Sequence, residues 1–168
     1  VGYQVQAVGL SPSSTTIQIA LLPLREPVAP AVVSGLNVGY YVLAAPSVLP
    51  DFGALSPYQN DVVPRINYPS TNGNFATSGR ADEVGAVFTG LLTVPTDGLY
   101  TLFIESDDGS RLKIGSDIIV SNDGLHGMLE RSGPVAFKAG AHPITVEFFE
   151  NGGGAGLIAR IQGPGVPK

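Results

Sequence analysis

Apolar residues recur along this chain in short runs that are separated by glycine, proline, asparagine and aspartate. Several runs alternate apolar and polar positions, which is the period-two pattern of a half-buried strand, and no segment has a helical period. The pattern predicts strands over residues 36–43, 84–94, 99–104, 114–120, 132–137, 144–149 and 157–161. Short strands at intervals of about eight to twelve residues indicate an all-β sandwich or barrel.

The first 34 residues differ from the rest of the chain. Residues 1–7 and 15–22 each alternate apolar and polar positions, and a Ser-Pro-Ser-Ser turn signal separates them. The prolines that follow favour an extended connector, because proline lacks the N–H that a central strand needs. We therefore expect a β-hairpin extension with a proline-rich linker over residues 1–34, and the main β-domain over residues 35–168. The extension either packs on the same chain or docks on a neighbouring subunit by strand addition.

Residues 44–78 are rich in proline, asparagine, serine and glycine, with only short apolar islands. They predict a long loop between the first two strands of the main domain. A loop of this length inside a compact domain is usually functional or irregularly packed, so it is a candidate for contacts with a ligand.

Composition narrows the classes of partner. The chain is 43% hydrophobic, which excludes a disordered chain, whereas only 14% of its residues are charged against about 25% in an average protein. The net charge is −5 and the nine Lys and Arg residues form no cluster, which argues against nucleic acid or an anionic membrane as a partner. No cysteine is present, which excludes disulfides, thiol nucleophiles and zinc–thiolate sites.

The sequence shows no membrane span and no leader. No apolar run reaches the roughly 18 residues of a membrane-spanning helix, so we expect no membrane insertion. The chain begins at Val1 without a methionine, so we expect a mature, processed or excised segment.

The most distinctive stretch is Glu105–Ser110, where two adjacent carboxylates, Asp107 and Asp108, end a strand-like run. Adjacent carboxylates repel each other unless a cation or hydrogen-bond donors lie between them. Oxygen ligands in a loop suit calcium, which takes about six to eight of them. The alternative is a simple hairpin turn, because Asp and Gly dominate turns. The residues alone leave both interpretations open.

Several segments recur in the order and spacing of a known family: Gly35–Tyr41, Phe88–Leu92, Asp97–Thr101, Ser106–Leu112, Ala139–Ile144 and Val146–Glu150. Through them the chain resembles, over roughly residues 35–165, the PA-fourteen domain family, which is named for anthrax protective antigen. That family is a β-sandwich found in bacterial toxins, glycosidases, yeast flocculins and adhesins. The resemblance therefore implies an antiparallel β-sandwich or barrel, here with an N-terminal β-extension.

Lectin members of that family bind calcium through two consecutive aspartates joined by a cis peptide, an Asn side chain and two backbone carbonyls from a later loop. The resemblance assigns these roles to Asp107 and Asp108, to the side chain of Asn151, and to the carbonyls of Gly153 and Ala155. Small residues in the later loop let backbone carbonyls approach an ion closely. The implied cofactor is Ca²⁺.

In those lectins sugar hydroxyls complete the shell of the ion, and loops around it select the sugar. The resemblance implies a carbohydrate site that comprises Asp107, Asp108 and Asn151. Candidates for further contacts with the sugar are the long loop, taken here as Ala44–Arg80, and the residues Arg80 and Asp82 at its end. The Asn122–His126 loop is a further candidate for contacts with the sugar.

Other polar residues have simpler interpretations. The Asn122-Asp123-Gly124 segment lacks the ligand periodicity of an EF-hand and is interpreted as a hairpin turn. His142 lies at a strand entry and is interpreted as structural, whereas His126 has no acidic partner at metal-ligand spacing. Three glutamates are interpreted as residues that decorate or terminate strands: Glu105, Glu147 and Glu150.

We expect no enzymatic activity. The sequence has no nucleophile-elbow motif. Two adjacent aspartates also cannot act as a glycosidase pair, because such carboxylates flank the scissile bond from separate positions roughly 5–10 Å apart.

Together these features favour a calcium-dependent carbohydrate-binding domain of lectin or adhesin type that acts outside the cell or on its surface and binds extracellular glycans. The alternative is a structural subunit of an extracellular fibre or surface assembly, which the low charge and the N-terminal extension suggest. In that case residues 1–33 mediate contacts between copies of the chain, and any bound calcium is structural.

Overall fold

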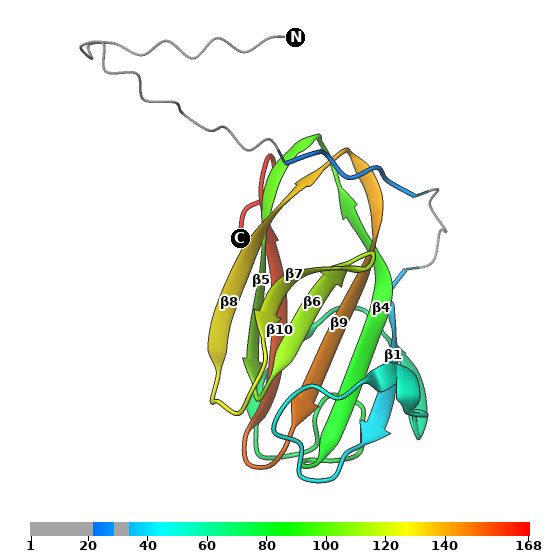
Figure 1. Ribbon diagram of the computed structural model, residues 1–168, viewed down its shortest axis with the longest axis vertical. Helices are drawn as coiled ribbons and strands as arrows, with labels where there is room; N and C mark the ends of the chain where they lie inside the picture. The colour runs from blue at the N-terminus through cyan, green and yellow to red at the C-terminus, as the bar shows by residue number, and fades with distance from the viewer. Residues whose placement is uncertain (1–21, 29–33) are drawn as a thin grey trace, which may run out of the picture.

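The computed structural model describes residues 22–28 and 34–168, and it forms ten β-strands and one short 3-10 helix within them (Figure 1). The strands are β1 (Leu36–Val42), β2 (Gln59–Val63), β3 (Asn67–Thr71), β4 (Val84–Val94), β5 (Gly98–Asp107), β6 (Ser110–Ile114), β7 (Asp117–Asn122), β8 (Leu129–Phe137), β9 (Gly140–Glu150) and β10 (Ala155–Gln162). The helix is η1 (Phe52–Ala54). Across the described residues, no helix is long and apolar enough to cross a membrane.

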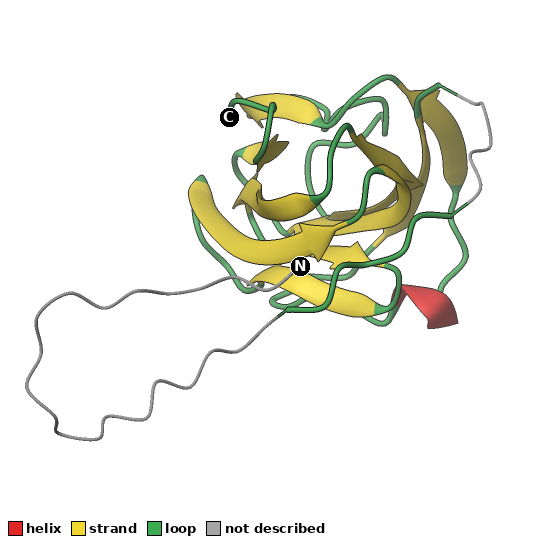
Figure 2. Ribbon diagram, turned by 90° about the horizontal axis from the view of Figure 1, so that it is seen from above, coloured by secondary structure: helices red, strands yellow, loops and turns green. Residues whose placement is uncertain are grey.

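The strands form two antiparallel sheets that pack face to face. One has the order β2-β1-β4-β9-β6-β7 and the other the order β3-β10-β5-β8. Figure 2 looks down the long axis of the domain and shows the strands arranged in layers around the interior. This architecture confirms the predicted all-β antiparallel sandwich.

Each sheet buries one face in a shared core. In β5 the side chains of Tyr100, Leu102 and Ile104 are buried while the residues between them are partly exposed, which is the period-two pattern of the sequence. Aromatic rings fill the centre, where Phe75 stacks on Phe148 with ring centroids 4.2 Å apart. Burial of such a side chain stabilises the fold by about 1.5–3 kcal/mol.

Consecutive strands repeatedly cross between the sheets: β4 to β5, β5 to β6, β7 to β8, β8 to β9 and β9 to β10. The segments after Asp107 and after Asn122 therefore join sheets, and the hairpin interpretation of both is wrong. Strands joined by a hairpin and strands joined by a crossing bury the same alternate residues. A period-two pattern therefore does not distinguish the two connections.

The strand predicted over residues 114–120 is two strands. Gly115 has a φ of 59°, a left-handed conformation that favours glycine, and it turns the chain between β6 and β7 into a hairpin. Its N–H donates to the carbonyl of Pro143 at 3.0 Å. The sequence does carry a turn signal here, Gly115-Ser116-Asp117, which the prediction of a single strand overlooked.

The prediction of one long loop over residues 44–78 is also wrong in part, because this segment contains η1, β2 and β3. Both are short edge strands with at most one buried residue each, so they lack a strong apolar pattern. The helix is held by Phe52, whose ring lies 4.9 Å from that of Tyr41. Phe52 fits there because Gly85 has no side chain; a Cβ at Gly85 would lie 2.6 Å from the Phe52 ring.

Residues 22–28 form a clasp over the end of the sandwich where β8 crosses to β9. Arg25 makes a parallel bridge with Phe137, and Val28 makes an antiparallel bridge with Ala141. The clasp therefore contacts both sheets. This part of the expected N-terminal extension packs on the main domain, whereas the strands expected over residues 1–7 and 15–22 lie outside the described residues.

Deleting residues 1–28 should destabilise the domain more than deleting residues 1–21. Only the longer deletion removes three backbone hydrogen bonds of the clasp, which contribute about 1 kcal/mol each, and the ion pair between Arg25 and Asp117. We expect the free energy of unfolding to fall by about 3 kcal/mol in urea titrations. Equal stability of the two proteins would show that the clasp contributes nothing, and light scattering on both would test the predicted contacts between copies.

Candidate functional site

Two sheet crossings meet at one end of the sandwich. Asp107 at the end of β5 is in register with Gly156 of β10, and Ser110 of β6 is in register with Phe148 of β9. The crossing after β5 and the crossing after β9 therefore lie side by side although they are far apart in sequence. The peptide bond between Asp107 and Asp108 is cis, as the resemblance implies.

Asp108 is held by backbone N–H groups from two other segments. Its side chain is buried; Oδ1 accepts a hydrogen bond from the N–H of His126 at 3.0 Å, and Oδ2 accepts one from the N–H of Asn151 at 3.0 Å. Asp108 thus ties the loop after β7 and the crossing after β9 to the aspartate pair.

Glu150 places a third carboxylate in the site. It is 0% exposed, and its Oε2 accepts a hydrogen bond from the N–H of Asp108 at 2.9 Å. Burial, and then the charges of Asp108 and Asp107, together raise the pKa of Glu150 to about 8. Glu150 does end β9, as expected, but the sequence interpretation overlooked its place in the site.

Asp107 is more exposed than Asp108 and has fewer partners. Burial, and then the charge of Asp108, raise the pKa of Asp107. Its Oδ2 accepts a hydrogen bond from the Ser70 hydroxyl at 3.3 Å. Ser70 belongs to β3, inside the segment that was expected to be a loop, so the sequence offered no signal for this contact.

The donor set fits a hard cation. One carboxylate oxygen from each of Asp107, Asp108 and Glu150 lies within 4.8 Å of the others, so a single ion could contact all three residues. Calcium takes oxygen ligands at about 2.3–2.6 Å in flexible geometry. The buried Oε1 of Glu150 has no hydrogen-bond partner, which an ion would supply.

The other expected ligands lie on the crossing after β9. Asn151 is adjacent to the carboxylates through its backbone, and Gly153 and Ala155 follow on the same segment. Between them, Gly154 lies so close to the site that a Cβ there would be 2.9 Å from Oδ2 of Asp107. Coordination by the Asn151 side chain and by the carbonyls of Gly153 and Ala155 stays a prediction.

An open hollow of about 580 Å³ adjoins the site, and the two residues expected to contact a sugar line it. Arg80 and Asp82 share this hollow with Asn151 and Gly152. Oδ1 of Asp82 accepts a hydrogen bond from the N–H of Gly153 at 3.1 Å, which links the hollow to the crossing after β9. The buried Nε of Arg80 has no hydrogen-bond partner among the described residues. The structure thus brings both residues beside the site, and their contact with a sugar stays a prediction.

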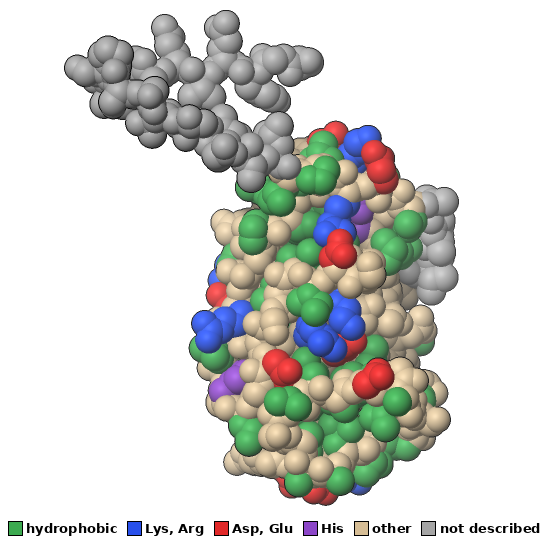
Figure 3. Space-filling view, in the orientation of Figure 1, with side chains coloured by type: hydrophobic (Ala, Val, Ile, Leu, Met, Phe, Trp, Pro, Cys, Tyr) green, Lys and Arg blue, Asp and Glu red, His purple; other side chains and the backbone are tan. Residues whose placement is uncertain are grey.

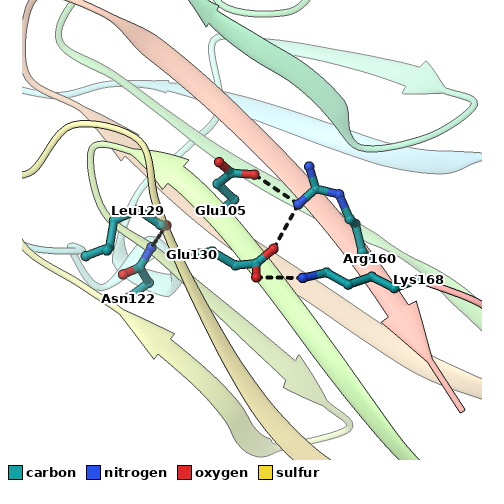
Figure 4. A network of polar contacts seen from close by, with 6 residues as sticks. All are labelled: Glu105, Asn122, Leu129, Glu130, Arg160 and Lys168. Atoms are coloured by element: carbon teal, nitrogen blue, oxygen red, sulfur yellow. Dashed lines mark hydrogen bonds and ion pairs between the residues drawn. The ribbon is translucent and has the colours of Figure 1, made fainter.

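The end of β7 and the loop that follows it also contact the segments around the site. Asn122 is buried, and its side-chain amide donates to the hydroxyl of Ser106 at 3.1 Å. The same amide donates to the carbonyl of Leu129 at 2.8 Å (Figure 4). The backbone of His126 in this loop contacts Asp108, as described above. His142 lies elsewhere in the core, where its Nε2 is 2.8 Å from the carbonyl of Lys138, which fits the structural role expected for it.

Charged side chains outside the site pair with each other. Arg160 of β10 contacts both Glu105 and Glu130 at 2.9 Å, and these residues lie on the outer face of the four-stranded sheet (Figure 4). On the other sheet, Arg111 and Lys113 both contact Glu147. On the face of the molecule that Figure 3 shows, Lys and Arg side chains accordingly lie beside Asp and Glu side chains, and no large patch carries a single charge.

Comparison with known proteins agrees with the fold described above. A family model described as PA14 domain matches residues 33–167. Sequence comparison finds no relative among curated proteins.

Three solved structures share the fold. The PA14 domain of the MpAFP antifreeze protein has a TM-score of 0.67 and 16% identity, and the match covers 84% of this chain and 88% of that chain. The PA14 sugar-binding domain from an RTX adhesin has a TM-score of 0.64 and 19% identity, with coverage of 78% and 90%. The epithelial adhesin 9 A domain from Candida glabrata, in complex with Galβ1-3GlcNAc, has a TM-score of 0.63 and 12% identity, with coverage of 88% and 91%.

Proposed function

Because the chain belongs to the PA14 domain family, we propose that it is a calcium-dependent carbohydrate-binding domain of lectin or adhesin type that acts outside the cell. The observation that carries the proposal is the position of the Asp107–Asp108 pair: Asp108 accepts a hydrogen bond from the N–H of Asn151, and Asn151 lines an open polar hollow. An ion held there is accessible to a ligand that enters from the hollow.

The names of two structural neighbours support glycans as the ligand class. One is a sugar-binding domain of an adhesin, and another was solved with a disaccharide. In this chain the Arg80 guanidinium supplies hydrogen-bond donors to the hollow and the Asp82 carboxylate supplies acceptors. Sugar hydroxyls both donate and accept hydrogen bonds, so they match this mixture. Calcium completes the site, because hydroxyl oxygens are ligands that it accepts.

We propose binding without catalysis. One carboxylate oxygen from each of Asp107, Asp108 and Glu150 lies within 4.8 Å of the others, so the three groups are too close together to flank a substrate. Glycosidase carboxylates act from separate positions roughly 5–10 Å apart. The site therefore supports an ion better than it supports acid–base hydrolysis.

Calcium should raise the melting temperature of the domain, and removal of calcium with EGTA should reverse the effect. A ligand that binds only the folded state stabilises it by about 2.7 kcal/mol at a hundredfold excess over its dissociation constant. Asp107→Ala should lose this response because it removes one of the carboxylates around the ion. Differential scanning calorimetry with and without calcium measures both effects.

Asp117→Asn is the matched control for Asp107→Ala. Asp117 lies beside Arg25 at the clasp, away from the aspartate pair, so its substitution should leave the calcium response intact. A glycan array with and without calcium then tests the ligand class. If Asp107→Ala responds to calcium as the native protein does, or if the native protein binds no glycan in calcium, the proposed function is wrong.

A further inference from the structure

Glu150 has an environment that a purely structural carboxylate would avoid. It is fully buried at the end of β9, and no Lys or Arg side chain pairs with it among the described residues. Its nearest charged neighbours are Asp107 and Asp108, which carry charge of the same sign. A buried charge without a counter-charge is strongly destabilising. A cation in this position would remove the conflict.

The hydrogen bonds around the site leave one buried oxygen without a partner. Both oxygens of Asp108 accept backbone N–H groups, and Oε2 of Glu150 accepts the N–H of Asp108. The N–H of Gly152 also lowers the pKa of Glu150, yet Oε1 has no hydrogen-bond partner of normal geometry. Oε1 is therefore the buried acceptor that remains available to an ion.

The distances allow one ion to contact all three carboxylates. Oxygen atoms of Glu150, Asp107 and Asp108 lie within 4.8 Å of one another. Two ligands of one calcium ion are at most about twice the Ca–O distance apart, and that distance is about 2.3–2.6 Å. The hydrogen bond from Asp108 to Oε2 also fixes the glutamate next to the aspartate pair.

We infer that Glu150 is a direct ligand of the cation, through Oε1, so that the site has three carboxylates instead of two. The inference rests on the proposed cation site. A third carboxylate raises the negative charge around the ion and should tighten its binding, because ligand charge tunes calcium affinity. It should also favour calcium over magnesium, which demands octahedral geometry and keeps several of its waters.

The number of water molecules on the bound ion tests direct ligation. Terbium, a luminescent oxygen-binding ion of similar chemistry, replaces calcium, and its luminescence lifetimes in H₂O and D₂O report the waters that it carries. Glu150→Gln keeps the size of the side chain and an acceptor for the Asp108 N–H but removes the charge. We expect this variant to bind terbium at least about tenfold more weakly and to add about one bound water, because water fills a vacated calcium-type position.

Glu147→Gln is the matched control. Glu147 is also buried on β9, but it contacts Arg111 and Lys113 on the outer face of the sheet and not the aspartate pair. It should retain the native affinity and water count. Glu150→Asp, which keeps the charge but shortens the side chain, provides a second variant and should also add about one water, since its carboxylate no longer reaches the ion.

The outcomes are distinguishable. The amide oxygen of a glutamine can also bind a calcium-type ion, so the water count is compared in both variants. An unchanged water count in both folded Glu150→Gln and folded Glu150→Asp overturns the inference, whether or not the affinity falls, because a positioning role alone would weaken binding without opening a coordination position. If the native protein binds neither terbium nor calcium, the proposed cation site itself is wrong.

Discussion

Replacing Gly109 with alanine should both destabilise the domain and abolish calcium binding. Gly109 follows the aspartate pair, and a Cβ there would lie 2.3 Å from Cε1 of Phe149 and 3.0 Å from the backbone N and O of Gly124. Phe149 is fully buried and the Gly124 contacts are backbone atoms, so none of these neighbours can move easily. Overpacking of this kind lowers the free energy of unfolding by about 1–3 kcal/mol. Because the added methyl group would also clash with backbone atoms, we expect Gly109→Ala to lose about 3 kcal/mol.

The loss of binding follows from the same clash. To accept the methyl group, the chain after Asp108 must shift away from Gly124, and the adjoining His126 N–H then leaves Oδ1 of Asp108. Urea titration measures the stability and calorimetric titration measures the calcium affinity. Gly127→Ala, in the loop after β7 that also contains Gly124, is the control, because a Cβ at Gly127 has no atom within 4 Å. Native-like calcium binding by Gly109→Ala would contradict the prediction.

The calcium-free domain should lose stability as the pH rises from about 4.5 towards 8. Folding raises the pKa of Glu150 from 4.5 to about 8, so the folded state favours the protonated acid. The stabilisation from this group is complete below the pKa of the unfolded chain and is lost as the pH rises through the folded value. Each unit of pKa difference corresponds to about 1.4 kcal/mol, so the loss by pH 7 is about 3 kcal/mol.

The comparison with Glu150→Gln isolates this contribution, because other carboxylates titrate in the same range. In EGTA the variant should gain stability relative to the native protein by about 3 kcal/mol between pH 4.5 and pH 7. Saturating calcium should reverse the order at pH 7, since the ion stabilises the ionised carboxylate. Urea titrations at several pH values measure the difference. Parallel pH profiles of the two proteins in EGTA would disprove the expected shift.

Several elements of the fold were predictable from the sequence because they depend on local pattern. The strand β5 has buried residues at alternate positions, because it buries one face, and β1, β4, β9 and β10 are recognisable as short apolar segments between turn residues. The strands β2 and β3 were not predictable in this way. They are short sheet edges with polar outer faces, and their pairing with β1 and β10 defines them.

Some residues of the candidate site were likewise predictable from the sequence, whereas others were not. The adjacent aspartates and the following glycine are visible in the sequence, because repulsion between neighbouring carboxylates is a property of the local chain. Glu150 and Ser70 became part of the site only through folding, when the crossing after β9 and the edge strand β3 came to lie against Asp107 and Asp108.

The sequence by itself therefore determined the fold class, the family resemblance and the two aspartates, since strand periodicity and adjacent charge need no distant partner. Only the tertiary structure decided that the Asp-Gly segments cross between sheets and that residues 22–28 pack on the domain. It also decided that a third, buried carboxylate faces the aspartate pair. These features depend on pairing between segments far apart in the chain, and a period-two pattern is the same whichever partner a strand finds.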